Sequence, residues 1–227
     1  MKKILAFGAG RVAKPCIQYL LQKGDYEVFL VDKIRENLDL TLSGSCRGHP
    51  VTDDVFENAG RLMDEYRPDV VLCLLPAAMN RRIAEECIQR SINMTAASYA
   101  KEEIRSLSAE AEAKGMTLLF EMGLDPGIDH MSAARMIKKV HDENGKIDSF
   151  WSVCGSLPEA SSNNNPFGYK LSWAPSSVVD SSKREARIIK DKRVIVMPDG
   201  ETFLHPSFVE IKGLGWFEEY ANGDSTP

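Results

Sequence analysis

The regular alternation of short apolar runs with helical patterns over the first 120 residues is the feature that most limits how this chain can fold. The apolar runs lie at residues 4–7, 27–31, 49–51, 69–75, 93–97 and 116–120. Segments with apolar residues at helical spacing separate them, the last over residues 101–114. The run at 69–75 is almost entirely apolar, which is typical of a central parallel strand covered on both faces. This order predicts an α/β fold with a doubly wound parallel sheet.

The alternation ends after Gly123, and the pattern of the remaining sequence is of another kind. It predicts a helix over 128–141, a strand over 146–155, a loop over 156–168 and a hairpin over 187–196. No closing element is recognisable from Gly213 onward. We therefore expect a first domain over residues 1–122 and an incomplete second α/β domain over residues 123–227.

A glycine-rich turn follows the first apolar run. Residues 8–13 read Gly-Ala-Gly-Arg-Val-Ala and match the pattern G-x-G-x-x-A between a strand and a helix. In this pattern Gly8 permits the tight turn, Gly10 lets the backbone approach a pyrophosphate, and Ala13 lets the helix pack closely on the strand. The N–H groups and the positive dipole end of the helix then face the phosphates. The turn therefore predicts a dinucleotide site; the alternative is a glycine turn that binds nothing.

An acidic residue ends the second apolar run at the distance that dinucleotide-binding domains use. Asp32 lies 22 residues after Gly10. A carboxylate in this place accepts hydrogen bonds from the ribose hydroxyls and repels a 2′-phosphate. This favours NAD as the cofactor. Lys33 and Arg35 follow at once and can meet a phosphate, so NADP stays open as the alternative.

Three groups of residues stand at the strand ends, where such sheets bind ligands. They follow or close the fourth, fifth and sixth runs: Leu74-Leu75-Pro76, Ser98-Tyr99 and Asp125-Pro126-Gly127. We expect them to converge near a nicotinamide ring. Each group has a structural alternative: the two leucines as core residues, Ser98-Tyr99 as a cap of the helix that begins near Lys101, and Asp125 as the N-cap of the next helix.

The other chemistry-bearing residues give weaker signals. Asp129 and His130 are adjacent and point to different faces of a helix, with no further ligand at metal spacing, so no metal site is predicted. Cys154 ends a predicted strand, where a lone cysteine is most often a small buried residue. Trp173 follows a long polar loop and either covers the cofactor or anchors the loop in the core.

The composition argues against several other classes of protein. The net charge of −5 argues against nucleic acid or an anionic membrane as a partner, because both need a basic face. No stretch of about 18 apolar residues is present, and the apolar run after the N-terminal lysines is too short for a signal peptide. The five cysteines form no C-x-x-C pair, which indicates a reducing cytoplasm.

Six segments of the chain carry a family resemblance. They are GAGRVAKP at 8–15, CLLP at 73–76, ASY at 97–99, EMGLDPGIDHMSA at 121–133, CGSLP at 154–158 and NPFGYKLSW at 165–173. Together they resemble the saccharopine dehydrogenase (saccharopine reductase) family in its glutamate-forming branch. The resemblance implies a Rossmann domain followed by an α/β domain with substrate contacts and a dimer interface. It also implies an oxidoreductase of lysine metabolism that transfers a hydride from saccharopine to NAD(P)⁺ and yields glutamate and 2-aminoadipate 6-semialdehyde.

The resemblance assigns roles to individual positions. Those implied at the cofactor are Gly8, Gly10, Arg11 and Val12 on the pyrophosphate, Asp32 at the ribose, Leu75 and Pro76 on the nicotinamide side, and Trp173. Lys33 is expected at the cofactor from its place beside Asp32, where it can meet a phosphate. Those implied at the substrate are Ser98, Tyr99 and Asp125, with Cys154 lining the pocket; Asp125 and Cys154 are the implied catalytic positions. Asp125 either binds the substrate ammonium as a counter-charge or accepts a proton. We favour the counter-charge, with water as the base.

The chain departs from that family in length and at two positions. It is shorter than the family's members, and Gly223 and Ser176 stand where relatives carry arginines that suit substrate carboxylates. Two alternatives therefore stay open: a truncated or non-catalytic dinucleotide-binding protein, and a related carboxyaminopropyl-amine dehydrogenase. The expected partners are a small amino acid substrate and a second copy of the chain.

Overall fold

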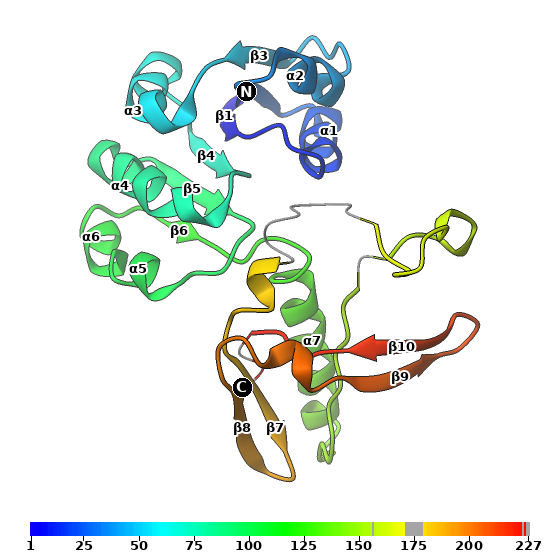
Figure 1. Cartoon of the computed structure of the whole chain (residues 1–227). Helices are drawn as coiled ribbons and strands as arrows, with labels where there is room; N and C mark the ends of the chain where they lie inside the picture. The colour runs from blue at the N-terminus through cyan, green and yellow to red at the C-terminus, as the bar shows by residue number, and fades with distance from the viewer. Residues whose placement is uncertain (156, 171–178, 224, 226–227) are drawn as a thin grey trace. The chain divides into compact units, whose positions relative to one another are not determined.

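The chain forms two compact units, Met1–Cys154 and Gly155–Pro227 (Figure 1). The structure is a computed structural model that describes residues 1–155, 157–170, 179–223 and 225. Trp173 and Ser176 lie outside the described residues. The domain boundary expected near residue 123 lies inside the first unit and stays a prediction.

A six-stranded parallel sheet is the centre of the first unit. Its strands are β1 (Lys2–Phe7), β2 (Tyr26–Asp32), β3 (Gly48–Thr52), β4 (Val70–Cys73), β5 (Asn93–Ala96) and β6 (Leu118–Leu119). They lie in the order β3-β2-β1-β4-β5-β6, and every neighbouring pair is parallel. The order reverses between β1 and β4, where sheets of this kind bind ligands at the carboxyl ends of the strands. The predicted α/β fold and its six strands are confirmed.

Helices cover both faces of this sheet (Figure 1). One face carries α1 (Ala13–Lys23) and α2 (Arg35–Leu42); the other carries α3 (Val55–Tyr66), α4 (Asn80–Arg90), α5 (Glu102–Arg105) and α6 (Ser108–Ala113). Alternate residues of β1 divide between the two cores, with Ile4 and Ala6 on the α1 side and Leu5 and Phe7 on the α3 side. All four are buried, which explains why this run is apolar at every position.

Local sequence decides where several of these helices begin and end. Gly24 adopts φ +86° and ends α1 in the left-handed conformation. The Asp54 carboxylate accepts a 2.9 Å hydrogen bond from the Phe56 N–H and caps α3. The single helix expected over 101–114 is instead the pair α5 and α6. Between them, the Ser106 hydroxyl donates to the Glu103 carbonyl at 3.0 Å, a side-chain bond of the kind that competes with the helical ladder.

The segment after β6 begins as expected and then differs. Helix α7 (Ile128–Asp142) confirms the predicted helix, although none of its residues is buried. The strand expected over 146–155 is wrong, because these residues, all of them described, form no strand. Trp151 is 71% exposed and Val153 48%. In the part of the chain that the structure describes, this segment pairs with no strand, and alternation without a paired strand does not make a strand.

The second unit contains two antiparallel hairpins. β7 (Ala186–Lys190) pairs with β8 (Arg193–Met197), and β9 (Ser207–Ile211) pairs with β10 (Gly215–Glu219). Asp191 and Lys192 adopt φ +51° and +62°, as a two-residue hairpin turn requires. The hairpin expected over 187–196 is confirmed. The expectation of no closing element after Gly213 is wrong, since β10 lies there.

Three short 3₁₀ helices complete the described elements: η1 (Ala77–Met79), η2 (Ala160–Ser162) and η3 (Thr202–Leu204). Among the described residues, no helix combines the length and the apolar character that crossing a membrane requires.

Candidate functional site

The first element of the site is the glycine turn at the carboxyl end of β1. Gly8 has φ +101°, and its N–H donates to the Val31 carbonyl at 2.9 Å. A Cβ atom at Gly8 would lie 3.1 Å from the Leu74 carbonyl oxygen and 3.2 Å from the Leu75 side chain. Glycine is therefore needed here for two reasons: the backbone conformation and the close approach of the β1 and β4 ends.

The second glycine of the turn has open space in front of it. A Cβ atom at Gly10 would meet no protein atom within 4 Å, and Gly10 is exposed. Arg11 and Val12 follow in the turn and are also exposed. Helix α1 then begins with no side-chain cap and no acidic residue in its first turn. This open space beside the backbone, at the positive end of a helix, fits a diphosphate.

The carboxylate of Asp32 is held beside this turn. One of its oxygens accepts the Ala9 N–H at 2.8 Å, and the other accepts the Ile34 N–H at 2.9 Å. Each carboxylate oxygen has two lone pairs, so each can also accept one ribose hydroxyl. The residues present therefore fit both the diphosphate and the ribose of a dinucleotide.

Two exposed cations follow Asp32, and both are paired with carboxylates. Lys33 Nζ lies 2.8 Å from Asp54 Oδ2, and this hydrogen bond lowers the pKa of Asp54. Arg35 Nε lies 3.0 Å from Asp39 Oδ1, one turn further along α2. Together with Asp32, the carboxylates of Asp39 and Asp54 accompany these two cations. Both cations are more than half exposed, so these surface pairs are weak.

A short polar relay lies behind the carboxyl ends of β4 and β5. At the end of β4, Leu75 is half-buried and packs against the core, and Pro76 is exposed. Asn80, which the sequence pattern did not identify, is only 2% exposed. Its Oδ1 lies 3.3 Å from the Cys73 thiol, and its Nδ2 donates to Ser98 Oγ. The relay connects β4, α4 and the loop after β5.

Tyr99 and Asp125 meet directly. The Tyr99 hydroxyl donates to Asp125 Oδ1 at 2.8 Å, and both residues are half-buried. The structure therefore brings together two of the three residues expected to contact the substrate. The capping alternatives are wrong: Gly127, rather than Asp125, precedes α7, and no side chain caps α5 after Lys101.

Two glycines shape the loop that presents Asp125. The Gly123 N–H donates to the Pro126 carbonyl at 2.9 Å and closes the loop. Gly127 has φ +148°, and a Cβ atom there would overlap the Gly123 carbonyl oxygen and lie 2.6 Å from Gly123 N. No side chain fits at Gly127 without moving the loop, and the position of Asp125 depends on this close backbone contact.

Glu121 connects the two halves of this site, and the sequence analysis missed it. Its N–H donates to the Ser98 carbonyl at 3.0 Å, and its Oε1 accepts the Ala100 N–H at 3.1 Å. Glu121 thereby holds the chain on both sides of Tyr99. Its Oε2 also lies 4.0 Å from His130 Nδ1. Glu121 follows the sixth apolar run, so the strand-end rule could have identified it; buried Asn80, inside a helix, carries no such signal.

The carboxylates of Asp125 and Asp129 act electrostatically on the Cys154 thiol. Loss of water around the thiol raises the pKa of Cys154, and the charges of Asp125 and Asp129 raise it further. The thiol therefore stays protonated at neutral pH, which does not fit a nucleophile. Cys154 is exposed, so its interpretation as a small buried residue is wrong. Within the described residues, no three His, Cys, Asp or Glu side chains form a group that could hold a metal ion.

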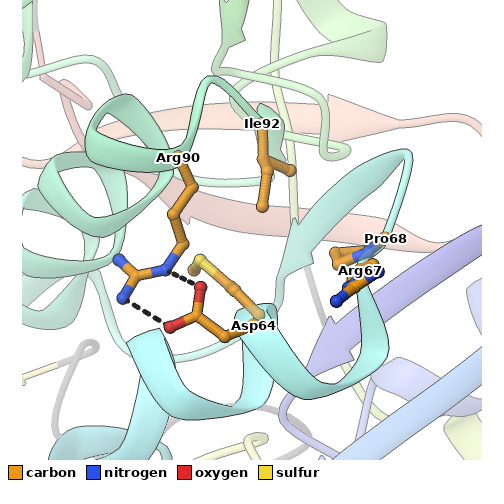
Figure 2. Close-up of a pocket in the computed structure, with 6 residues that line it drawn as sticks. Asp64, Arg67, Pro68, Arg90 and Ile92 are labelled. Atoms are coloured by element: carbon orange, nitrogen blue, oxygen red, sulfur yellow. Dashed lines mark hydrogen bonds and ion pairs between the residues drawn. The ribbon is translucent and has the colours of Figure 1, made fainter.

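A hollow of about 420 Å³ lies at the opposite, amino-terminal edge of the sheet (Figure 2). It is lined by Met63, Asp64, Arg67, Pro68, Arg90 and Ile92. Arg90 Nε and Nη2 donate to the two Asp64 oxygens at 2.7 and 3.0 Å and join α4 to α3. This ion pair is a contact between two helices, and the hollow contains none of the residues of the glycine turn or of the Tyr99–Asp125 pair.

The fold and the glycine turn define a Rossmann-type α/β domain of the dinucleotide-binding class. Residues 4–119 match the family model described as the saccharopine dehydrogenase NADP binding domain. Residues 123–227 match the model described as the saccharopine dehydrogenase C-terminal domain. The chain belongs to the saccharopine dehydrogenase family, and the resemblance noted in its motifs is confirmed.

Relatives and a solved structure agree with this assignment. Saccharopine dehydrogenase (NADP(+), L-glutamate-forming) of Pyricularia oryzae is 31% identical over 233 residues, which cover 100% of this chain and 50% of that protein. Alpha-aminoadipic semialdehyde synthase of Arabidopsis thaliana is 34% identical over 87% of this chain and 20% of its own length. The apo saccharopine dehydrogenase (L-Glu forming) of Saccharomyces cerevisiae has a TM-score of 0.83 and 30% identity, covering 99% of this chain and 50% of that one. The chain spans half the length, or less, of these relatives.

Proposed function

We propose that the first unit binds a nicotinamide dinucleotide, with the diphosphate at residues 8–13 and a ribose at Asp32. The observation that carries this proposal is that the open turn at Gly10 and the Asp32 carboxylate occur together. The turn leaves open the space that a Cβ atom at Gly10 would take, and the Ala9 N–H ties the Asp32 carboxylate to the same turn. The remaining cofactor contacts in this proposal are Arg11, Val12, Lys33, Leu75 and Pro76.

Two observations disagree about which dinucleotide binds. The family model and the Pyricularia relative are named for NADP, which favours NADP over NAD. The Asp32 carboxylate itself opposes a 2′-phosphate, although the neighbouring Lys33 and Arg35 are exposed cations in weak surface pairs. We give more weight to the charges, since they belong to this chain, and propose NAD as the better cofactor.

We propose saccharopine as the substrate, bound at Ser98, Tyr99 and Asp125 with Cys154 on the wall of the site. When bound, the dinucleotide supplies the acceptor for the hydride that leaves the amine-bearing carbon. The amine must be neutral for this step, because its lone pair forms the C=N bond. Water then splits that bond and releases glutamate and 2-aminoadipate 6-semialdehyde. In this proposal the chain orients the substrate and balances its charge.

Absorbance of the reduced cofactor tests the proposal. The chain is mixed with saccharopine and NAD, and in parallel with saccharopine and NADP, and calorimetry measures the binding of each dinucleotide alone. We expect reduction of both dinucleotides to be detectable and a higher kcat/KM with NAD. A higher kcat/KM with NADP contradicts the choice of NAD. No heat from either dinucleotide contradicts the cofactor site itself.

Asp125 is proposed as the counter-charge for the substrate ammonium, with water as the base. Tyr99 holds one of its oxygens at 2.8 Å and so orients the carboxylate. Asp125→Ala is expected to raise KM for saccharopine about 10- to 100-fold and to change the dinucleotide Kd less than about twofold. Steady-state kinetics with both substrates varied measures this. Asp142→Ala, at the far end of α7, is the control, and an unchanged KM for Asp125→Ala defeats the assigned role.

One observation favours a second candidate, a non-catalytic dinucleotide-binding protein. Gly223 stands where the resemblance places an arginine for a substrate carboxylate. Here it has φ +59°, and its carbonyl accepts the Arg187 N–H at 2.9 Å. Dinucleotide binding without any turnover of saccharopine supports this candidate. Turnover of a related carboxyaminopropyl amine in place of saccharopine supports the other alternative enzyme.

We also propose a cytoplasmic location and a homodimer. The five cysteines are free, which is typical of a reducing compartment, and the family resemblance includes a dimer interface. The Bos taurus relative is named as mitochondrial. Cell fractionation distinguishes the two locations. Light scattering tests for a particle of twice the 25.3 kDa chain mass.

A further inference from the structure

A buried amide lies directly behind the proposed substrate site. Asn80 is the first residue of α4 and is 2% exposed. Both ends of its amide are engaged, since Oδ1 lies 3.3 Å from the Cys73 thiol and Nδ2 donates to Ser98 Oγ. A polar side chain buried this deeply is costly unless it forms such bonds. Asn80 therefore has partners at a strand end on one side and at a proposed substrate residue on the other.

The Cys73 thiol decides which way this amide faces. Burial raises the pKa of Cys73 to about 11, so the sulfur keeps its hydrogen at neutral pH. A protonated thiol is a donor and only a weak acceptor, so its better partner is the carbonyl oxygen of Asn80, as in the 3.3 Å contact with Oδ1. The NH₂ group of Asn80 is then the end that faces Ser98.

The Asn80 amide in turn determines the direction in which the Ser98 hydroxyl can donate its hydrogen. Ser98 Oγ accepts a hydrogen from Asn80 Nδ2, so the hydroxyl hydrogen cannot point toward the same NH₂ group. Among the described residues, the Ser98 hydroxyl has no side-chain acceptor. Ser98 is half-buried at the ligand edge of the sheet, and its O–H is therefore available to a bound molecule.

We propose that Asn80 is a positioning residue that makes the Ser98 hydroxyl a hydrogen-bond donor toward the substrate, and that Ser98 thereby receives a substrate carboxylate. This inference rests on the proposed function. An O–H donor to a carboxylate forms a charge-assisted hydrogen bond, which is stronger than a neutral one. A Ser98 hydroxyl turned the other way presents only lone pairs and repels the same group.

The test replaces the NH₂ donor by an acceptor of the same shape. In Asn80→Asp the Ser98 hydroxyl donates to the new carboxylate and turns its lone pairs toward the substrate. We expect KM for saccharopine to rise about 10- to 100-fold, with a smaller change in kcat and a dinucleotide Kd within about twofold of the original. An unchanged KM overturns the inference.

A double variant separates this effect from direct repulsion by the new carboxylate. Ser98→Ala alone is expected to raise KM by a similar factor. Because Asn80 acts through Ser98, adding Asn80→Asp to Ser98→Ala is expected to raise KM no further. A second increase of the same size in the Ser98→Ala background shows that Asn80 acts by another route and overturns the inference.

Cys73 provides a second route if Asn80→Asp does not fold. Cys73→Ser keeps a donor for Asn80 Oδ1 and is expected to leave KM unchanged. Cys73→Ala removes that donor, lets the amide turn over, and is expected to raise KM. Equal KM values for the two variants contradict the inference. If the original chain oxidises saccharopine with neither dinucleotide, the proposed function fails, which is distinct from an active chain whose variants are unaffected.

Discussion

The first 120 residues and the remainder of the chain use apolar residues in opposite ways. In the first region the apolar runs become paired strands, and helices such as α3 bury Leu62 and Met63 against them. After Phe120, Ala186 is the one buried hydrophobic residue other than proline in the described part of the chain. Helix α7 has a helical apolar pattern as α3 does, yet buries no residue. Periodicity thus specifies an element, whereas burial depends on a partner surface.

A matched pair of truncations tests this contrast and has the largest expected effect. Leu62→Ala is expected to lower the free energy of unfolding by about 2–5 kcal/mol, because it leaves a cavity between α3 and the sheet. Met136 on α7 is 62% exposed, so Met136→Ala is expected to change it by less than about 0.5 kcal/mol. Urea unfolding of both variants measures the difference. An equal loss of unfolding free energy in the two variants would contradict the contrast between the two regions.

A second pair compares glycines of positive φ in the two units. Gly127→Ala puts a Cβ atom 2.6 Å from Gly123 N, so the loop must move and take Asp125 away from Tyr99. We expect a loss of about 1–3 kcal/mol in the free energy of unfolding and weaker saccharopine binding. Gly213→Ala meets no atom within 4 Å and carries only the conformational cost of about 1 kcal/mol. Thermal unfolding ranks the two, and the reverse ranking contradicts the role of the Gly123–Gly127 contact.

The two glycines of the turn sharpen the distinction between folding and binding inside the first region. Gly10→Ala meets no protein atom, so its melting temperature is expected to stay unchanged while the dinucleotide Kd rises about tenfold. Gly8→Ala crowds the Leu74 carbonyl and is expected to lower the melting temperature as well. Calorimetric titration and thermal unfolding are measured on both. A Gly10→Ala variant that binds as tightly as the original removes the observation on which the cofactor site rests.

The smallest expected effect concerns Cys154, the last residue of the first unit. Loss of water and, after it, the negative charge of Asp125 raise the pKa of this thiol, so Asp125→Asn is expected to lower the pKa and increase the thiolate fraction at neutral pH. Iodoacetamide labelling of Cys154, followed by mass spectrometry of its peptide, is expected to speed up about two- to fivefold. Exposed Cys46 is the internal control. A slower reaction at Cys154 contradicts the electrostatic link.

Much of the first region could be predicted because its signals are local. Residues 69–75 are apolar at nearly every position since β4 is covered on both faces, and Asp32 ends β2 at the spacing that the glycine turn requires. The strand-end rule likewise selected Tyr99 and Asp125, and in the structure the Tyr99 hydroxyl oxygen lies 2.8 Å from Asp125 Oδ1. Residues 146–155 show the limit of such reasoning, because their alternation meets no neighbouring strand in the described structure.

The sequence by itself determined the α/β class, the glycine turn and the family, because each depends on residues a few positions apart or on spacing along one chain. Only the tertiary structure decided that Asn80 reaches Ser98, that Glu121 holds the chain on both sides of Tyr99, and that α7 buries none of its residues. These contacts join segments that are distant in sequence, and their hydrogen-bond directions depend on burial and on neighbouring groups that no linear pattern contains.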